Sequence, residues 1–261
     1  MATPLKYSIN GEIRKPEEAF LPLPDDGLFR GDGVFEVIRL YSGRPFAFEA
    51  HLDRMERSAA AIELPLDRAA LEVDAARLIT EAPPNCLLRL VVTRAGHRIL
   101  TLEELPQHLP TITLATVTYS PTVILNGVKS LSYGANMQAT RIAKAAGADE
   151  ALFVRPDGVV LEPPTSSIFW ATREGTLRTP MLEAGVLDSI TRRKIVDRME
   201  VEEDEFPLAD LLAASEVFLA STTREAHPVA RINDREIPAV NGELTRAAAL
   251  AFKQTLKEEL G

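Results

Sequence analysis

The sequence predicts an α+β fold, and two observations indicate this class. Stretches rich in β-branched and aromatic residues are mixed along the chain with segments of helical periodicity. Asn-Gly and Pro-Asp-Gly turn signals lie between several of the strand-like stretches. The composition, 46% hydrophobic and 26% charged, is ordinary for a soluble protein, and 261 residues suffice for one large domain or two modest ones.

The first half of the chain is predicted to form several strands and two helices. Asn10-Gly11 supplies the positive φ values of a type I′ turn, so we expect a hairpin around it. Asp67 is a candidate N-cap for a helix that ends near Glu81, and another helix is expected over residues 49–62. The expected strands are 5–9, 12–13, 34–40, a second strand around Phe46 and Phe48, 86–93 and 111–118.

The second half is predicted to continue this mixture. Gly147 suits the C′ position of a helix over residues 134–146, and residues 155–158 are expected to form a turn between two strands. Residues 185–192 are expected to be a strand that runs into a helix, with Asp188 or Ser189 as the N-cap. The other expected strands are 150–154, 159–161, 166–171 and 217–220, and the other expected helices are 208–214 and 243–260.

The charge and hydropathy of the chain argue against several classes of function. A net charge of −9 without a basic stripe argues against a nucleic-acid partner. The sequence has no run of about 18 apolar residues to cross a membrane and no secretory signal pattern, so we expect a cytoplasmic protein. The single cysteine, Cys86, excludes an intramolecular disulfide framework. His97 and His227 have no metal-like spacing with other ligands, and no metal site is predicted.

Lys129 lies in an apolar stretch near the middle of the chain, in the segment GVKSLSY. Lysine is seldom buried without a task, and an amine in apolar surroundings can act as a nucleophile. The other interpretation is a lysine at a strand end whose ammonium group reaches water along its aliphatic chain. Lys129 is therefore a candidate for the covalent attachment of an aldehyde cofactor.

Two stretches suit a phosphate group. A helix that starts at Ile190 and Thr191 offers unpaired N–H groups, and Ser221-Thr222-Thr223 offers three hydroxyl residues just after a strand. Arg54, on the helix over residues 49–62, could supply positive charge. Each feature also has an ordinary interpretation, as a common helix start, a common loop and a surface charge.

Three other charged residues are candidates for a site. Glu162 leads into Pro163-Pro164-Thr165, a rigid non-helical bend, where a carboxylate could meet a ring nitrogen or be a solvated acid in a turn. Arg98, or Arg94, could clamp a substrate carboxylate in a bidentate manner. The alternative is that both arginines are surface residues at a strand end.

Five stretches of the chain carry a pattern that identifies a family. They are GDGVFEVIRLYSGRPFAFEAHLDRMERSA, GVKSLSY, GADEALFVRPDGVVLE, GVLDSITR and EVFLASTTREAHPV. In this order they resemble the fold-type IV (class IV) pyridoxal-phosphate aminotransferases, and the resemblance spans about residues 20 to 235. It implies a small α/β domain and a larger pseudo-barrel α/β domain with the cofactor between them. We expect these domains at residues 1–118 and 126–261, with a linker at 119–125.

The resemblance assigns roles to individual residues. Lys129 matches the lysine that forms a Schiff base with pyridoxal 5′-phosphate, and Glu162 matches the acid that keeps the pyridine nitrogen protonated. Arg54 matches the arginine that binds the cofactor phosphate. The other residues implied for cofactor binding are Tyr133, Ser166, Ile190, Thr191, Ser221 and Thr222. The residues suggested for the substrate are Phe35, Arg94, Arg98 and Thr223.

Four positions depart from the family pattern. Where the family usually has Gly, Asn, Gly and an aromatic residue, this chain has Pro163, Ser167, Ser189 and Arg30. None of these changes removes a chemical group that the mechanism needs. Ser167 is expected to loosen the hydrogen bonds around Glu162, and Arg30 to alter the substrate pocket.

The family includes branched-chain aminotransferases, D-amino-acid transaminases and 4-amino-4-deoxychorismate lyases. The resemblance implies transfer of an amino group between an amino acid, of the D or branched-chain type, and a 2-oxo acid. A lyase of the aminodeoxychorismate type is the alternative, because the short chain and the run Ile168-Phe169-Trp170 are compatible with it. A third interpretation is a structural or binding protein that inherited the fold. Family members are usually homodimers, so we expect a homodimer.

Overall fold

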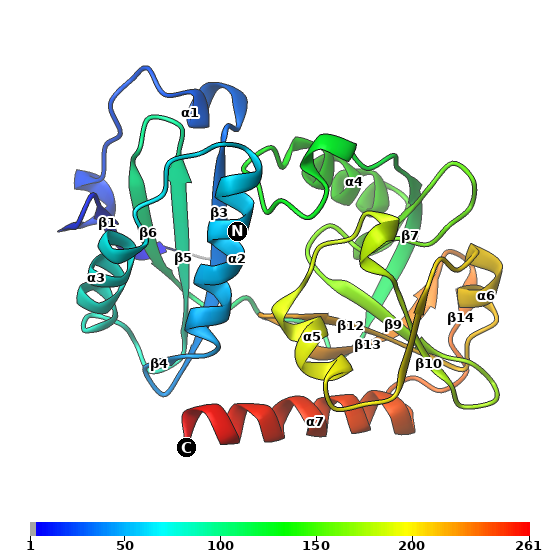
Figure 1. Cartoon of the computed structure of the whole chain (residues 1–261). Helices are drawn as coiled ribbons and strands as arrows, with labels where there is room; N and C mark the ends of the chain where they lie inside the picture. Colours follow the sequence, from blue (N-terminus) through cyan, green and yellow to red (C-terminus); the bar gives the residue numbers. More distant parts are fainter. Residues whose placement is uncertain (1–3) are drawn as a thin grey trace. The chain divides into compact units, whose positions relative to one another are not determined.

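The computed structural model describes residues 4–261, and the chain divides into two compact units (Figure 1). The first unit takes in the chain as far as Gln107 together with Val128–Tyr133. The second unit takes in His108–Gly127 and Gly134–Glu259. The segment that contains Lys129 therefore belongs to the first unit. Each unit combines a sheet with helices, and the predicted α+β class is confirmed.

The first unit is built on one antiparallel sheet. Its strands lie in the order β2-β1-β6-β5-β3-β4, and each neighbouring pair is antiparallel. The predicted hairpin is confirmed, since β1 pairs with β2 across Asn10 and Gly11, which both have positive φ. The strand bounds are Pro4–Ile9 (β1), Glu12–Arg14 (β2), Gly33–Tyr41 (β3), Arg44–Pro45 (β4), Cys86–Thr93 (β5) and Arg98–Glu103 (β6).

Two longer helices accompany this sheet. Asp67 caps the second of them as predicted, because its side chain accepts a hydrogen bond from the backbone N–H of Ala70. The expected strand around Phe46 and Phe48 is wrong, because β4 ends before Phe46 and Phe48 already begins a helix. Ala47, at φ 53°, turns the chain between them. The helices are α1 (Asp26–Arg30), α2 (Phe48–Ala61), α3 (Arg68–Ile79) and the 3-10 turn η1 (Pro16–Glu18).

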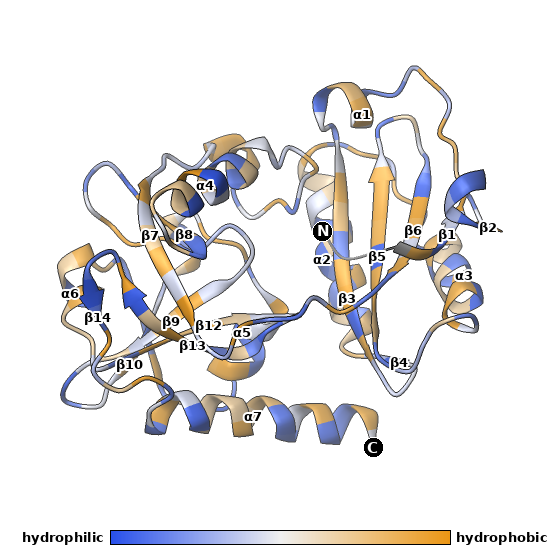
Figure 2. Ribbon diagram, turned by 180° about the vertical axis from the view of Figure 1, so that it is seen from behind, coloured by the Kyte–Doolittle hydropathy of each residue, from blue (hydrophilic) through white to orange (hydrophobic). Residues whose placement is uncertain are grey.

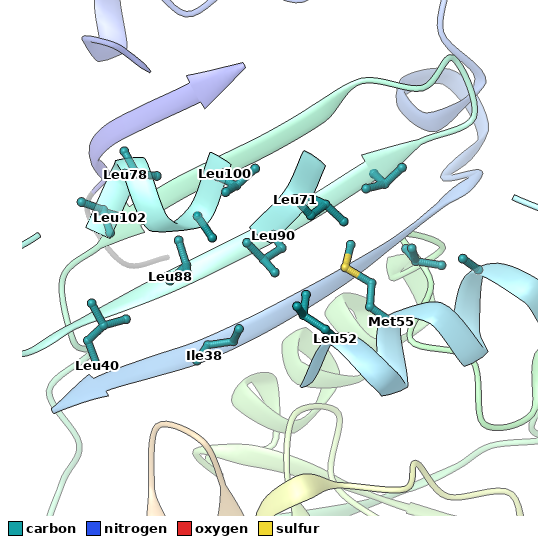
Figure 3. Packing of buried hydrophobic residues seen from close by; sticks show 14 of the residues in the cluster. Ile38, Leu40, Leu52, Met55, Leu71, Leu78, Leu88, Leu90, Leu100 and Leu102 are labelled. Carbon is teal, nitrogen blue, oxygen red and sulfur yellow. The ribbon is translucent and has the colours of Figure 1, made fainter. Parts of the chain in front are cut away.

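The core of the first unit lies between one face of this sheet and helices α2 and α3 (Figure 3). Ile38 and Leu40 on β3 and Leu52 and Met55 on α2 are almost completely buried in it. Figure 2 shows that β3 and β5 are largely hydrophobic. Burying a large apolar side chain such as Ile38 or Leu52 contributes about 1.5–3 kcal/mol to the stability of the fold. Because side chains alternate across a strand, Glu36 of β3 shares the face of Ile38, and it is fully buried there.

The second unit is built on a mixed sheet. Its strands lie in the order β11-β10-β9-β12-β13-β7-β8, and β14 pairs with β13. The pairs β10–β11, β13–β7 and β7–β8 are parallel, and the others are antiparallel. The strand bounds are Ile112–Thr118 (β7), Glu150–Val154 (β8), Ser167–Ala171 (β9), Leu177–Pro180 (β10), Val201–Asp204 (β11), Glu216–Ser221 (β12), Glu225–Ile232 (β13) and Arg235–Glu236 (β14).

The helices of the second unit follow the sequence pattern closely. A parallel pair needs a crossover, and α4 supplies it between β7 and β8. Gly147 lies beyond the end of α4 at φ 77°, as its predicted C′ position requires. Figure 2 shows hydrophobic and hydrophilic residues alternating in bands along α7. The bounds are Gly134–Ala145 (α4), Ile190–Val196 (α5), Leu208–Leu212 (α6), Glu243–Leu260 (α7), and Val123–Leu125 (η2) and Leu182–Ala184 (η3) for the 3-10 turns.

The segment 185–189 corrects one expectation. It is not a strand but an irregular connection from η3 to α5. The backbone N–H of Leu187 donates to the carboxylate of Glu162 rather than to a neighbouring strand, which explains why no ladder forms. The predicted cap is confirmed for Ser189, whose side chain accepts a hydrogen bond from the N–H of Arg192.

Candidate functional site

Lys129 is held by its backbone on the edge of β3. Its carbonyl oxygen accepts from the N–H of Phe35 (3.0 Å), and its N–H donates to Ser58 Oγ on α2 (3.1 Å). Next to it, Ser130 forms a β-bridge with Val34. This attachment depends on Gly33, because a Cβ there would lie 2.4 Å from the carbonyl oxygen of Val92. The position of Lys129 is therefore fixed by two elements of the first unit.

The side chain of Lys129 lies against an aromatic pair. Its Nζ is 4.5 Å from the centroid of the Phe35 ring, within the range of a cation–π contact. The Phe35 ring also meets the Tyr133 ring edge-on, with the centroids 5.4 Å apart. The structure thus brings together three residues that the sequence nominated separately.

Arg54 lies on α2 and belongs to a buried cluster of charged groups. Its Nε and Nη2 donate to the two carboxylate oxygens of Glu36, both at 2.7 Å, and His51 Nδ1 lies 2.8 Å from Glu36 Oε2. Glu36 is 0% exposed and Arg54 5%. Glu36 was not among the residues predicted from the sequence, although an acid within the apolar run VFEVI was a usable signal.

The electrostatics of this cluster favour a charged Glu36. Burial alone would raise the pKa of Glu36, but the charges and hydrogen bonds of Arg54 and His51 outweigh it and hold this pKa well below its ordinary value of 4.5. Burial lowers the pKa of His51, and Glu36 only partly opposes this. The charges of Arg54 and of Lys129 lower the pKa of His51 further.

Arg94 and Arg98, the predicted carboxylate clamps, both bind carboxylates of their own unit. Arg94 forms a bidentate pair with Asp32 (2.8 and 2.9 Å) and also donates to the carbonyl oxygens of Ile62 and Glu63. Arg98 Nε donates to Asp74 Oδ2 (2.8 Å). Arg94 would have to exchange Asp32 in order to clamp a substrate carboxylate in a bidentate manner, whereas Arg98 contacts Asp74 through its Nε.

Glu162 lies in the second unit and joins two of its segments. Its carbonyl oxygen accepts from the N–H of Phe153 on β8 (3.2 Å), and its Oε1 accepts from the N–H of Leu187 (2.7 Å). The side chain is thus tied to the connection that enters α5. The first residues of α5 are Ile190 and Thr191, both buried, and helix geometry leaves their N–H groups without a partner inside the helix.

Three buried serine hydroxyls lie where β9 begins and β12 ends. Ser167 pairs in register with Ala220. Ser166, Ser167 and Ser221 therefore occupy neighbouring positions at the same end of the antiparallel strands β9 and β12. Among the described residues 4–261, the hydroxyl oxygen of each of the three has no hydrogen-bond partner. A buried hydroxyl normally has a hydrogen-bond partner, so this end of the two strands suits a polar ligand. Ser167 was considered in the sequence only as a departure from the family pattern.

Thr222 and Thr223 lie in the short turn between β12 and β13 and are half-buried. The N–H of Arg224 closes this turn on the carbonyl oxygen of Ser221 (3.2 Å). Within residues 4–261, no three His, Cys, Asp or Glu side chains are grouped so that they could hold a metal ion. No helix of this part of the chain combines the length and the apolar character needed to span a bilayer.

Comparison with known proteins identifies the family. The family described as amino-transferase class IV matches residues 33–232, and the chain belongs to this family. It is 32% identical over 277 residues to the "Putative branched-chain-amino-acid aminotransferase" of Methanocaldococcus jannaschii, covering 95% of this chain and 96% of that protein. It is 30% identical to a D-alanine aminotransferase of Listeria monocytogenes, covering 89% of each chain.

Two further comparisons bear on reaction and fold. The aminodeoxychorismate lyase of Bacillus subtilis is 28% identical to this chain, over 95% of this chain and 94% of the lyase. A solved structure of a hypothetical aminotransferase from Mycobacterium tuberculosis, in its PLP-bound form, superposes with a TM-score of 0.87. It is 25% identical and covers 96% of this chain and 98% of that chain.

Proposed function

We propose that this protein is a pyridoxal 5′-phosphate-dependent aminotransferase that moves an amino group between an amino acid and a 2-oxo acid. The observation that carries the proposal is the fixed placement of Lys129 against Phe35 in a chain of the class IV aminotransferase family. An amine on a fixed support holds a captured aldehyde in one place, and the two backbone hydrogen bonds of Lys129 supply that support.

The residues of this chain fit the cofactor. The buried hydroxyls of Ser166 and Ser221 lack hydrogen-bond partners among the described residues. This is expected of groups that bind an anion such as a phosphate. The first N–H groups of α5, at Ile190 and Thr191, suit the same anion. The other residues that we propose for cofactor binding are Lys129, Arg54, Tyr133, Glu162 and Thr222.

Each residue has a defined task in the proposed reaction. Pyridoxal phosphate, when bound, withdraws electrons from the α-carbon of the amino acid. The carboxylate of Glu162 would favour a proton on the ring nitrogen. The Nζ of Lys129 would accept the proton that leaves the substrate α-carbon and deliver it to the C4′ carbon of the cofactor within the same half-reaction. Arg54 and the hydroxyl residues hold the phosphate, so the path of this proton stays short.

We propose a D-amino acid or a branched-chain amino acid as the amino donor. The D-alanine and branched-chain relatives support these two classes. Phe35 and Thr223 are the proposed substrate neighbours, and Arg98, or Arg94 in exchange for Asp32, binds the substrate carboxylate. The predicted homodimer and cytoplasmic location belong to the same proposal.

The second candidate is an aminodeoxychorismate lyase, which the Bacillus subtilis relative favours. It would use Lys129 and the same cofactor but release pyruvate. Incubating the protein with D-alanine, L-leucine or aminodeoxychorismate separates the two reactions. Pyruvate formed from aminodeoxychorismate without an amino acceptor supports the lyase, and amino transfer to a 2-oxo acid supports the aminotransferase.

The first test is the attachment of the cofactor to Lys129. The purified protein, soaked in pyridoxal 5′-phosphate, should absorb in the visible range, and borohydride followed by peptide mass spectrometry should place the label on Lys129. Lys129→Ala should abolish the label and lower activity by several orders of magnitude. Lys144→Ala, at an exposed site on α4, is the control and should behave as the wild type. A colourless, unlabelled wild type would refute the proposal.

A further inference from the structure

A buried ion pair links three segments of the second unit. Arg224 Nη2 donates to Glu150 Oε2 (2.7 Å), and Thr165 Oγ1 donates to Glu150 Oε1 (3.0 Å). The side chains of Arg224 and Glu150 are only 14% and 5% exposed. Arg224 comes from the β12–β13 turn, Thr165 from the bend after Glu162, and Glu150 from the first position of β8.

The position of each partner along the chain is informative. Arg224 follows Thr223 directly, and its own N–H closes the turn that contains Ser221 and Thr222. Thr165 directly precedes Ser166, whose hydroxyl is buried and without a partner among the described residues. Glu150 is paired with Leu114 of β7 and so lies on β8, the strand at the edge of the sheet next to β7. One carboxylate therefore ties both hydroxyl-bearing loops to a rigid strand.

Because Glu150 and Arg224 are buried, either charge would be unfavourable without the other. Burial raises the pKa of Glu150, while Arg224 and Thr165 act against that rise and Asp149 adds to it. Burial, assisted by the charges of Arg224 and His108 and opposed by Asp149, lowers the pKa of His227 to about 4, so His227 is neutral near pH 7. Removing one member of a buried pair leaves the other uncompensated, and the loops that carry the pair then shift.

We propose that Arg224 and Glu150 are positioning residues that hold the Ser221–Thr223 turn and the Thr165–Ser166 bend in the arrangement that binds the phosphate of the cofactor. The inference rests on the proposed function and deepens it. Neither residue touches the cofactor in this account, because both act through the neighbouring hydroxyl groups. An arginine in this turn thus contributes to phosphate affinity without being a phosphate ligand.

Comparing two cofactor forms separates positioning from general stability. Pyridoxal lacks the phosphate but keeps the aldehyde that reacts with Lys129, so a loss confined to pyridoxal 5′-phosphate identifies the phosphate site. For Arg224→Met we expect the dissociation constant of pyridoxal 5′-phosphate for the cofactor-free full-length protein to rise about tenfold. The dissociation constant of pyridoxal should stay within about twofold. Both can be measured by absorbance titration.

Three further variants complete the experiment. Arg224→Lys, which keeps the charge, should recover part of the affinity. Combining Glu150→Gln with Arg224→Met should cost no more than Arg224→Met alone, because the two residues act as one unit. Arg178→Met is the matched control, since Arg178 pairs with Glu202 and Asp210 on another part of the same unit, and its affinity for both compounds should match the wild type.

The outcomes are distinguishable. Equal losses for pyridoxal and pyridoxal 5′-phosphate, or an Arg224→Met variant that binds both as the wild type does, would overturn the positioning role. If instead the wild type binds neither compound and borohydride labels nothing at Lys129, the proposed function itself fails. Urea unfolding of each variant identifies any loss of affinity that comes from a partly unfolded protein.

Discussion

At the scale of single residues, the first unit owes its charged cluster to Glu36. The carboxylate lies in a row of apolar side chains on β3. It can be buried there because both of its oxygens have partners in Arg54 and His51. A buried pair of this kind is not a large net source of stability, yet breaking it is expensive. The proposed phosphate ligand, Arg54, is therefore oriented by a partner on the neighbouring strand.

Replacing Glu36 should expose this dependence. Glu36→Gln keeps the shape but leaves Arg54 as an uncompensated buried charge, so we expect a loss of about 3 kcal/mol in the free energy of unfolding, measured in urea. Glu49→Gln is the control, because Glu49 is 73% exposed in its pair with Arg68 and should cost less than about 1 kcal/mol. Equal effects of the two substitutions would contradict the buried-pair account.

We also expect Glu36→Gln to change the pH dependence of stability. The pKa of Glu36 is lower in the folded state than its ordinary value of 4.5, so its contribution to stability is present above that value and is lost as the pH falls towards the folded-state pKa. The wild type should therefore lose stability on acidification below about pH 4.5, and Glu36→Gln should lose less over the same range. Parallel stability curves would show that other groups dominate.

At the scale of elements, the first turn of helix α7 is held by hydrogen bonds to a side chain of strand β12. The carboxylate of Glu216 on β12 accepts hydrogen bonds from the N–H groups of Leu244 and Thr245 and from the hydroxyl of Thr245. Gly242 precedes the helix and passes so close that a Cβ there would lie 2.1 Å from Glu216 Cδ. The start of α7 thus depends on a glycine and on an acid 26 positions earlier in the chain.

Adding a methyl group at this point should loosen α7. We expect Gly242→Ala to cost about 2 kcal/mol of stability, because the Glu216 cap must move away from the helix. The matched background is Glu216→Ala, which already lacks the cap and the clash. In that background Gly242→Ala should cost less than about 0.5 kcal/mol, and a full additional cost would show that the clash with Glu216 is not the cause.

At the scale of the whole molecule, each unit has its own hydrophobic core. The first unit packs around Leu88, Leu90 and their neighbours, and Trp170 lies at 0% exposure in a separate cluster of the second unit. The chain has one tryptophan and one cysteine, and they fall in different units: Trp170 in the second, and Cys86, which is buried, in the first. Each core can therefore be followed by its own probe.

Unfolding should accordingly depart from a single two-state transition. We expect the urea midpoint reported by Trp170 fluorescence to differ from the midpoint at which Cys86 becomes reactive to a thiol reagent. Cys86 is inert while folded because it is buried, and burial raises the pKa of its thiol. Coincident midpoints for the two probes would show that the two cores unfold as one.

Sequence patterns of short range predicted much of this protein. The hairpin at Asn10-Gly11, the caps at Asp67 and Ser189 and the helix over 243–260 depend on residues a few positions apart, and the structure contains each of them. Strands β6, β10, β11 and β13 were not predicted. β10 and β11 have four residues each, β6 begins and ends on a charged residue, and β13 contains Pro228, so their partners in the sheet define them more than their own periodicity does.

By itself, the sequence determined the family and the identity of the candidate cofactor lysine, because a run of local motifs carries that information. Only the tertiary structure decided which charges meet. Glu36 and Arg54 are 18 positions apart, and Glu150 and Arg224 are 74 positions apart. No pattern within a window of residues can pair such groups, since burial and sheet register, which depend on the whole chain, determine whether an acid finds a base or water.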